Sequence, residues 1–108
     1  MPGCVCITTT TETEEQAQAL ASLLVKRRLA ACAQISPIKS VYRWQGSIES
    51  AGECRLVAKT RSELTRTVID TIKSNHAYEV PEIVVTEIVD GSEEYLAWIE
   101  TETQGDGD

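Results

Sequence analysis

The residues best suited to chemistry lie in one short segment, residues 76–82, with the sequence HAYEVPE. The segment holds the only histidine of the chain, His76, together with a phenol and two carboxylates. Neutral imidazole binds Cu(II) or Zn(II) well, and a carboxylate such as that of Glu82 can serve as a second ligand. These two residues cannot share a helix face, but a loop folded around Pro81 can bring them together. The segment therefore predicts a weak site for copper(II) or another divalent cation, with His76 and Glu82 as ligands.

The same segment also has a purely structural interpretation. His76 would then cap the preceding helix, Tyr78 would hydrogen-bond across a subunit interface, and Pro81 would set the start of the next strand. One histidine with one or two acids is fewer than the four ligands of a closed structural metal site. A strong site would therefore need ligands from a neighbouring subunit.

The composition is that of an ordinary globular domain with an acidic surface. The 108 residues suffice for one domain, and the formal net charge is −7. A protein that binds a phosphate backbone needs a basic face, so no nucleic-acid partner is expected. No apolar run approaches the ~20 residues of a membrane span, and the N-terminus lacks the pattern of a secretory signal. We therefore expect a cytoplasmic protein with no membrane partner, whose four cysteines are thiols.

Apolar periodicity places strands and helices in alternation along the chain. Strands are predicted over residues 4–10, 31–35, 40–44, 53–59 and 82–89. Helices are predicted over residues 14–28, from an N-cap at Ser62 to residue 75, and over residues 92–99. This β-α-β-β-α-β order with a short C-terminal helix predicts an α+β fold, a ferredoxin-like sandwich with both main helices on one face of an antiparallel sheet. Residues 1–102 then form a single domain, and residues 103–108 form a disordered acidic tail.

The two middle strands form a hairpin that is too long for the domain. The sixteen residues 29–44 would extend to roughly 50 Å, whereas a domain of this length has a radius of gyration of only ~13 Å. The tip, with Tyr42 and Trp44, should project beyond the core even if the arm bends at Pro37, which marks a bulge or an edge position. Ala51-Gly52 is expected to form a second bulge. An exposed aromatic ribbon is normally covered, most economically by another copy of the chain, so a homo-oligomer is predicted.

With these elements placed, the sequence resembles the CutA divalent-cation tolerance family. The resemblance rests on residues 28–35 (RLAACAQI), 40–49 (SVYRWQGSIE), 59–60 (KT), 76–83 (HAYEVPEI) and 95–99 (YLAWI). It spans nearly the whole chain, about residues 5–99. It implies a ferredoxin-like homotrimer in which strands of neighbouring subunits join at their edges, and a role in tolerance of copper and other divalent metals.

The resemblance also implies particular metal ligands. Copper binding in the family is associated with a histidine and a glutamate of the H-x-Y-x-x-P-E segment, which His76 and Glu82 match. It is associated as well with a cysteine of the first strand. Cys6 lies in that strand here, but an alignment anchored on the helices places a threonine, around Thr9, where the thiol ligand would be expected. The family therefore implies a weak metal- or ligand-binding site in a cleft between subunits.

Two other classes of function remain open from the sequence. A signalling or interaction module resembling PII-type regulators would bind a small anionic ligand or a partner protein between subunits, with Lys59, Tyr78 and Trp44 as candidate contacts. No Gly-rich phosphate loop is present, although Lys59, Arg61 and the basic cluster of residues 26–28 can contribute to an anion pocket. A phosphatase of this fold would need a phosphate-cradling loop with an arginine at the end of the first strand. Residues 8–13 hold neither arginine nor glycine, so we do not expect an enzyme.

Overall fold

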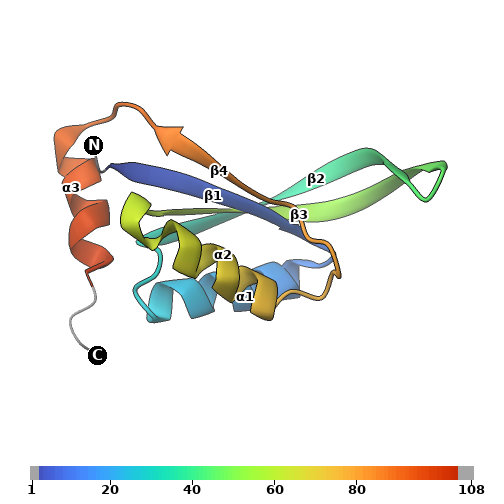
Figure 1. Ribbon diagram of the computed structural model, residues 1–108, viewed down its shortest axis with the longest axis horizontal. Helices are drawn as coiled ribbons and strands as arrows, with labels where there is room; N and C mark the ends of the chain where they lie inside the picture. The colour runs from blue at the N-terminus through green and yellow to red at the C-terminus, as the bar shows by residue number, and fades with distance from the viewer. Residues whose placement is uncertain (1–2, 105–108) are drawn as a thin grey trace.

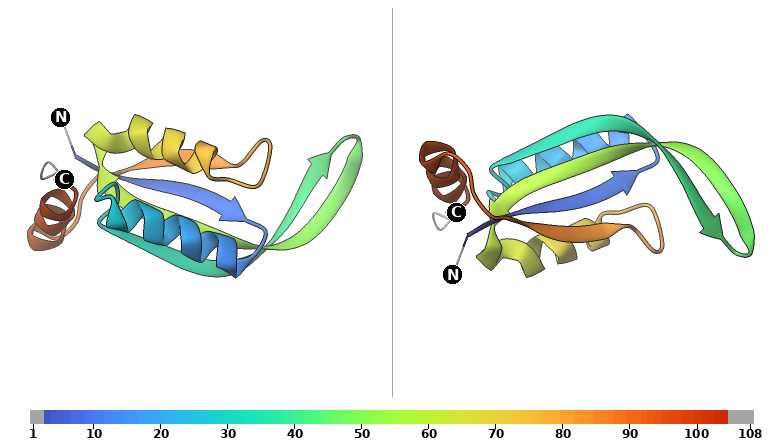
Figure 2. Two further views of the ribbon diagram at one scale, coloured as in Figure 1. Left: turned by 90° about the horizontal axis from the view of Figure 1, so that it is seen from below. Right: turned by 90° about the horizontal axis from the view of Figure 1, so that it is seen from above.

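The structure, a computed structural model that describes residues 3–104, is built on a four-stranded antiparallel sheet (Figure 1). Its strands run in the spatial order β2-β3-β1-β4. Two helices cover one face of the sheet and a third lies at one end of it (Figures 1 and 2). The elements are β1 (Cys4–Thr11), α1 (Glu14–Lys26), β2 (Cys32–Trp44), β3 (Ser47–Arg61), the 3₁₀ turn η1 (Ser62–Leu64), α2 (Thr65–Ser74), β4 (Ile83–Ile88) and α3 (Glu93–Glu102). The predicted α+β class, antiparallel sheet and element order are confirmed.

The main core lies between the sheet and helices α1 and α2. Alternate residues of β1 and β3, such as Ile7 and Leu56, point toward the helices and are fully buried. On α1 the buried side chains recur with helical spacing, as the sequence predicts, at Ala17, Leu20, Ala21 and Leu24. On α2 the buried positions are Val68 and Ile72. Because all these faces are apolar, their burial supplies the main driving force for this arrangement.

The ends of the two main helices differ from the prediction. Helix α1 ends at Lys26 and not at residue 28, because Arg28 adopts a left-handed conformation with φ of 58° that stops the helix and turns the chain toward β2. Ser62 does not cap α2. It lies in the preceding 3₁₀ turn, where its carbonyl accepts a hydrogen bond from the Thr65 hydroxyl at 2.7 Å. A capping box begins α1, in which the side chains of Thr13 and Gln16 each bond to the other residue's backbone N–H.

The β2-β3 hairpin forms an arm that runs past the ends of the helices (Figure 2). Pairing is continuous from Cys32 opposite Lys59 to Trp44 opposite Ser47, so the bulge predicted at Ala51-Gly52 is wrong. Pro37 fits without a bulge because β2 is an edge strand. The two turn residues between β2 and β3 have positive φ, 49° and 84°, as a tight two-residue turn requires. The molecule is 44 Å along its longest axis, which agrees with the predicted projecting tip.

Helix α3 closes the end of the molecule opposite the arm (Figure 1). Its Ile99 is fully buried against Cys4 and Ala31 in a second, smaller core. Thr103, just after the helix, is 1% exposed and receives hydrogen bonds from Arg61 at 3.0 and 2.9 Å. Thr103 is therefore packed against the rest of the domain, and the domain boundary at residue 102 stays a prediction. Residues 105–108 of the predicted tail lie outside the described residues. None of the described helices is long and apolar enough to span a membrane.

Candidate functional site

His76 lies just after α2 and is hydrogen-bonded at both ring nitrogens. The backbone N–H of Tyr78 donates to Nδ1 at 3.0 Å. Nδ1 must therefore be the acceptor, so Nε2 carries the proton and donates to the Thr10 carbonyl at 2.7 Å. The imidazole thus links β1 to the loop of residues 75–82. The structural interpretation of the sequence suggested that His76 caps α2, but its ring makes no bond to that helix. Both ring nitrogens are occupied by hydrogen bonds, so neither is free to bind a metal in this arrangement.

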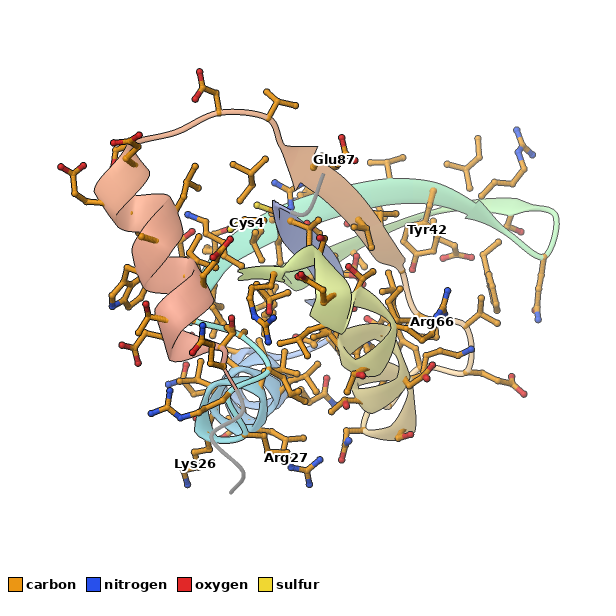
Figure 3. The ribbon with its side chains drawn as sticks, turned by 60° about the vertical axis from the view of Figure 1, so that its left-hand side comes forward. Cys4, Lys26, Arg27, Tyr42, Arg66 and Glu87 are labelled. Atoms are coloured by element: carbon orange, nitrogen blue, oxygen red, sulfur yellow. The ribbon has the colours of Figure 1, made fainter. Side chains whose placement is uncertain are left out.

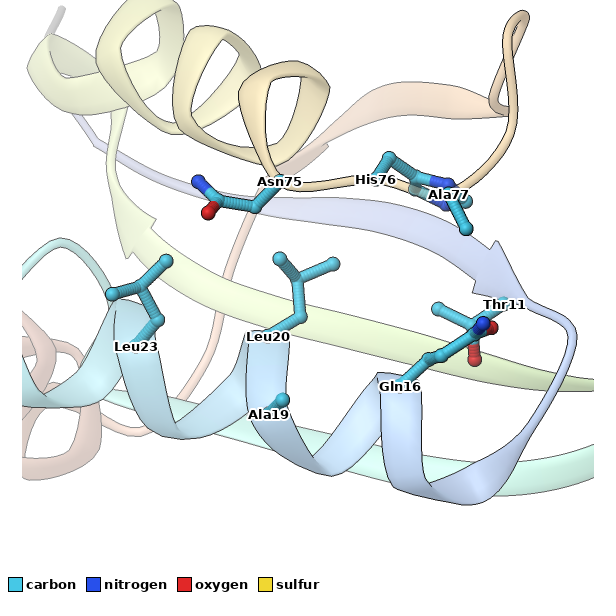
Figure 4. A pocket seen from close by; sticks show the side chains of 8 residues that line it. All are labelled: Thr11, Gln16, Ala19, Leu20, Leu23, Asn75, His76 and Ala77. Atoms are coloured by element: carbon cyan, nitrogen blue, oxygen red, sulfur yellow. The ribbon is translucent and has the colours of Figure 1, made fainter.

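Both predicted metal ligands line cavities, but not the same one. His76 borders a cavity of about 350 Å³ between α1 and the C-terminal end of α2 (Figure 4). The other lining side chains there are apolar or uncharged: Thr11, Gln16, Ala19, Leu20, Leu23, Asn75 and Ala77. Glu82 borders a different cavity, on the side of the loop that faces the arm. The structure therefore does not bring the His76 and Glu82 side chains together in one cavity.

The cavity that holds Glu82 is the larger of the two, at about 760 Å³. It lies between the arm and the loop of residues 78–82, and we call it the glutamate cavity. Four carboxylates line it, those of Glu12, Glu53, Glu79 and Glu82, together with the aromatic rings of Tyr42, Trp44 and Tyr78. No lysine or arginine of the described chain is among its lining residues. Its lining charge is therefore negative, which favours cations.

One of these carboxylates is held in place by two hydroxyl groups. Glu53 accepts a hydrogen bond from Ser40 on one oxygen and from Tyr78 on the other, each at 2.7 Å. Burial raises the pKa of Tyr78, and the hydrogen bond to Glu53 and the charge of that carboxylate raise it further. The Tyr78 phenol therefore remains protonated at neutral pH and keeps donating. The sequence suggested that Tyr78 bonds across a subunit interface, whereas this bond lies within one chain.

Lys59 lies outside the glutamate cavity, beside Tyr95 of α3, on the sheet face that α1 and α2 do not cover. Its ammonium group is 3.4 Å from the Tyr95 hydroxyl and 5.3 Å from the centre of that ring. The Tyr95 ring in turn stacks on Trp98 at 5.6 Å between centroids. The predicted ligand-binding trio is therefore split within one chain, with Tyr78 and Trp44 in the glutamate cavity and Lys59 outside it. The basic side chains Lys26 and Arg27 point away from the sheet at the outer end of α1 (Figure 3).

The cysteines add no metal-binding cluster. All four are free thiols, as predicted. Cys6 is paired across the ladder with Lys59, and Thr9, at the position where a thiol was expected, is fully buried with an unbonded hydroxyl. Burial raises the pKa of Cys4, which keeps that thiol protonated. Within residues 3–104, no three histidine, cysteine, aspartate or glutamate side chains converge closely enough to hold a metal ion.

Glu12 and Glu53 were missed as site residues from the sequence. Glu12 precedes α1 and looks like a part of its capping sequence, and Glu53 lies 23 residues before His76. The register of the β2-β3 hairpin is the signal that could have identified Glu53. A hairpin without bulges pairs Ser40 with Ala51, which sets Glu53 diagonally across from Ser40 on one face of the arm.

Comparison with known proteins identifies the family. A sequence profile described as "CutA1 divalent ion tolerance protein" matches residues 5–102. This chain belongs to that family. It is similar to "Divalent-cation tolerance protein CutA" of Archaeoglobus fulgidus, 43% identical over 81 residues that cover 75% of this chain and 79% of the relative. It is also 41% identical to "Protein CutA, chloroplastic" of Arabidopsis thaliana over 86 residues, 79% of this chain. The chain spans about half of that relative, because the match covers 47% of it.

Solved structures agree with the family assignment. "Structure of the Periplasmic divalent cation tolerance protein CutA from Archaeoglobus fulgidus" superposes with a TM-score of 0.92 at 39% identity, covering 94% of this chain and 99% of that one. A divalent cation tolerance protein from Thermus thermophilus gives a TM-score of 0.90 at 38% identity, covering 94% and 99%. The relatives' names place one in the chloroplast and one in the periplasm. The cytoplasmic location of this chain stays a prediction.

Proposed function

We propose that this protein acts in divalent-cation tolerance as a non-catalytic protein that binds cations weakly in the glutamate cavity. The observation that carries the proposal is the lining of that cavity, with four glutamates and no lysine or arginine among the described residues. Carboxylate oxygens are the ligands that hard divalent cations prefer, and Cu(II) accepts them as well. Glu82, predicted as a ligand from the sequence, is one of the four.

The binding should be weak, because the carboxylates do not form a cage. Across the described chain no three acidic, histidine or cysteine side chains meet at a metal-binding distance. A divalent cation would therefore keep much of its water and contact one or two carboxylates, as Mg²⁺ often does in proteins. The oxygens of Glu53 already accept hydroxyl bonds, so Glu82 and Glu79 are the more available contacts.

A copper(II) ion bound to His76 is a second possibility, proposed from the family motif. It would have to replace one of the two hydrogen bonds of the imidazole, and each such bond contributes ~1 kcal/mol. A ligand role for His76 would therefore be accompanied by movement of the 75–82 loop away from Thr10 or of Tyr78 away from the ring.

We also propose that the protein is a homotrimer. The arm exposes four large apolar side chains: Val41, Tyr42, Trp44 and Ile48, between 43% and 69% exposed. Strands β2 and β4 form the two edges of the sheet. Exposed apolar surface and open strand edges are usually covered by a partner chain, and the family resemblance implies three copies. The PII-like alternative, an anionic ligand held by Lys59, Tyr78 and Trp44, would need Lys59 from a neighbouring subunit.

Calorimetric titration of the metal-free protein with Cu(II) and with Mn(II) tests the cation site. Glu82→Gln should weaken binding of both ions up to about fivefold, because it removes one charge contact of up to ~1 kcal/mol. Glu87→Gln is the matched control, since Glu87 is an exposed glutamate of β4 that does not line the cavity. Equal affinities in the Glu82 and Glu87 variants would reject the cavity as the site.

His76→Ala separates the two possible copper sites in the same titration. This variant should lose ~1–2 kcal/mol of metal-free stability in urea unfolding wherever copper binds, because two hydrogen bonds disappear. If the glutamate cavity binds the ion, the folded variant should keep most of its copper affinity. If the folded variant loses its copper affinity, His76 is the ligand and the proposed cavity is not.

A further inference from the structure

The two faces of the β2-β3 arm carry opposite charges. Along residues 38–53 both cations, Lys39 and Arg43, lie on one face. Both carboxylates, Glu49 and Glu53, lie on the other face. This follows from the continuous register, because residues two apart on a strand share a face and residues paired across the ladder point the same way. We call the face that holds Lys39 and Arg43 the basic face.

The basic face continues the sheet face that α1 and α2 cover, but it lies beyond the ends of both helices (Figure 2). Nearer the core, Ile35 of the same face packs beneath the helices. Farther out, Ile48 is paired with Arg43 and is 69% exposed. Within residues 3–104 neither Lys39 nor Arg43 makes a hydrogen bond or an ion pair. The basic face is therefore apolar and positively charged, and the described part of its own chain does not cover it.

The glutamate cavity has the complementary chemistry. Four carboxylates line it without a lysine or arginine among the described residues, and Val80, which is 74% exposed, adds an apolar side chain. A chain cannot place its basic face in its own cavity, because the arm presents its other face to that cavity. The basic face of a second copy has no such restriction. Complementary charges at an interface determine which surfaces meet and in which register.

We propose that the basic face of one arm docks in the glutamate cavity of a neighbouring subunit. Arg43 of the partner subunit would meet Glu79 and Glu82, because a guanidinium binds carboxylates in a bidentate manner and also stacks on the aromatic rings that line the cavity. Ile48 of the partner subunit would pack against Val80. The cavity is thus incomplete in a single chain, and its rings are covered in the homotrimer. A head-to-tail contact of this kind closes into a ring, in which each of three subunits gives one arm and receives one.

Docking also gives the cation site a means of regulation. Arg43 of the partner subunit and a divalent cation would use the same carboxylates, so each should weaken the binding of the other, and by the same factor. A divalent cation in the cavity should therefore favour dissociation of the subunits. This consequence rests on the proposed function, whereas the docking itself does not.

Exchange of charges tests the docking. Sedimentation velocity measures the concentration at which the full-length protein dissociates, and circular dichroism verifies that each variant is folded. Arg43→Glu should raise this concentration about tenfold, because it sets a carboxylate against those of the cavity. Arg66→Glu is the matched control, since Arg66 is an exposed arginine of α2 outside the arm. Adding Glu82→Arg to Arg43→Glu should restore assembly, whereas adding Glu87→Arg should not.

Three outcomes would overturn the inference: a monomeric wild type, equal dissociation of the Arg43 and Arg66 variants, or rescue by Glu87→Arg as complete as that by Glu82→Arg. Titration with Mn(II) separates the inference from the proposed function. If Mn(II) binds through Glu82 while Arg43→Glu leaves assembly unchanged, the cation site stands and the docking falls. If the exchange of charges restores assembly but Mn(II) neither binds nor raises the dissociation concentration, the docking stands and the proposed cation site falls.

Discussion

The phenol of Tyr78 donates a hydrogen bond of 2.7 Å to the carboxylate of Glu53 and so ties the loop before β4 to the arm. Ser40 holds the other oxygen of the same carboxylate at 2.7 Å. Tyr78 is bound to His76 as well, through its backbone N–H. The carboxylate of Glu53 therefore joins the two walls of the glutamate cavity, the arm and the loop before β4. Tyr78 connects this carboxylate to His76, whose imidazole contacts β1.

The first prediction concerns this Tyr78–Glu53 bond. Tyr78→Phe removes the donor and leaves one oxygen of the half-buried Glu53 without its hydroxyl partner. The free energy of unfolding should fall by ~1–2 kcal/mol, the usual effect of losing a hydrogen bond to a charged group. Urea unfolding followed by circular dichroism measures it. Tyr42→Phe is the matched control, because Tyr42 lines the same cavity with 43% of its surface exposed. Equal stability of the two variants would contradict the prediction.

The second prediction is a loss of stability at alkaline pH. Burial raises the pKa of both Tyr78 and Cys4 above their ordinary values of 10.0 and 9.0. A raised pKa in the folded state means that folding favours the protonated form, so this stability is complete below pH 9 and is lost as pH rises through the pKa of each folded group. Unfolding free energies measured in urea between pH 7.5 and 11 should therefore decline above about pH 9.

Variants identify the groups responsible for this decline. Tyr78→Phe and Cys4→Ala should each make the fall in stability above pH 9 shallower, because each removes one group that must stay protonated. Deprotonation of Cys4 is opposed by its burial and by the nearby charges of Glu100 and Glu63. A pH profile that is identical in both variants and in the wild type would show that other groups control alkaline unfolding.

The third prediction concerns the arm. Light scattering after size-exclusion chromatography should give about 36 kDa, three times the 11.9 kDa of one chain. Val41→Glu should shift the protein toward monomer at micromolar concentration, because it places a charge in the middle of the apolar arm surface. Val25→Glu is the matched control, since Val25 is an exposed apolar residue on α1. A wild-type mass of 12 kDa, or dissociation of both variants alike, would contradict the arm as an interface.

Local patterns predicted the helices well. The box formed by Thr13 and Gln16 and the apolar positions of α1 are encoded within a few residues of one another, so they can be recognised without the rest of the fold. The exact ends were less predictable. Arg28 continues the periodic pattern of α1 but adopts a left-handed conformation, because the chain must turn there to enter β2. Such a turn depends on the packing of the sheet and not on the helix sequence.

The site was less predictable because it depends on contacts between distant segments. His76 and Glu82 are close in sequence and chemically suited to a common metal, yet they face different cavities on the two sides of one loop. Conversely, Glu12 and Glu53 lie far apart in sequence and line one cavity. The sequence analysis expected a bulge at Ala51-Gly52, and an extra residue there would have turned Glu53 to the other face of the arm. The hairpin pairs without a bulge, which places Glu53 on the cavity side.

The position of α3 has a practical consequence for experiments on surfaces. Strand β1 begins and α3 ends at one extremity of the molecule, and the arm occupies the opposite extremity (Figure 1). Arg61 fastens the residue that follows α3 through two hydrogen bonds. A tether attached beyond either described end would therefore leave the arm pointing away from the attachment surface. Immobilised subunits should thus keep the arm available for assembly with partner chains, which makes biosensor measurements of cation binding feasible without relocating the attachment point.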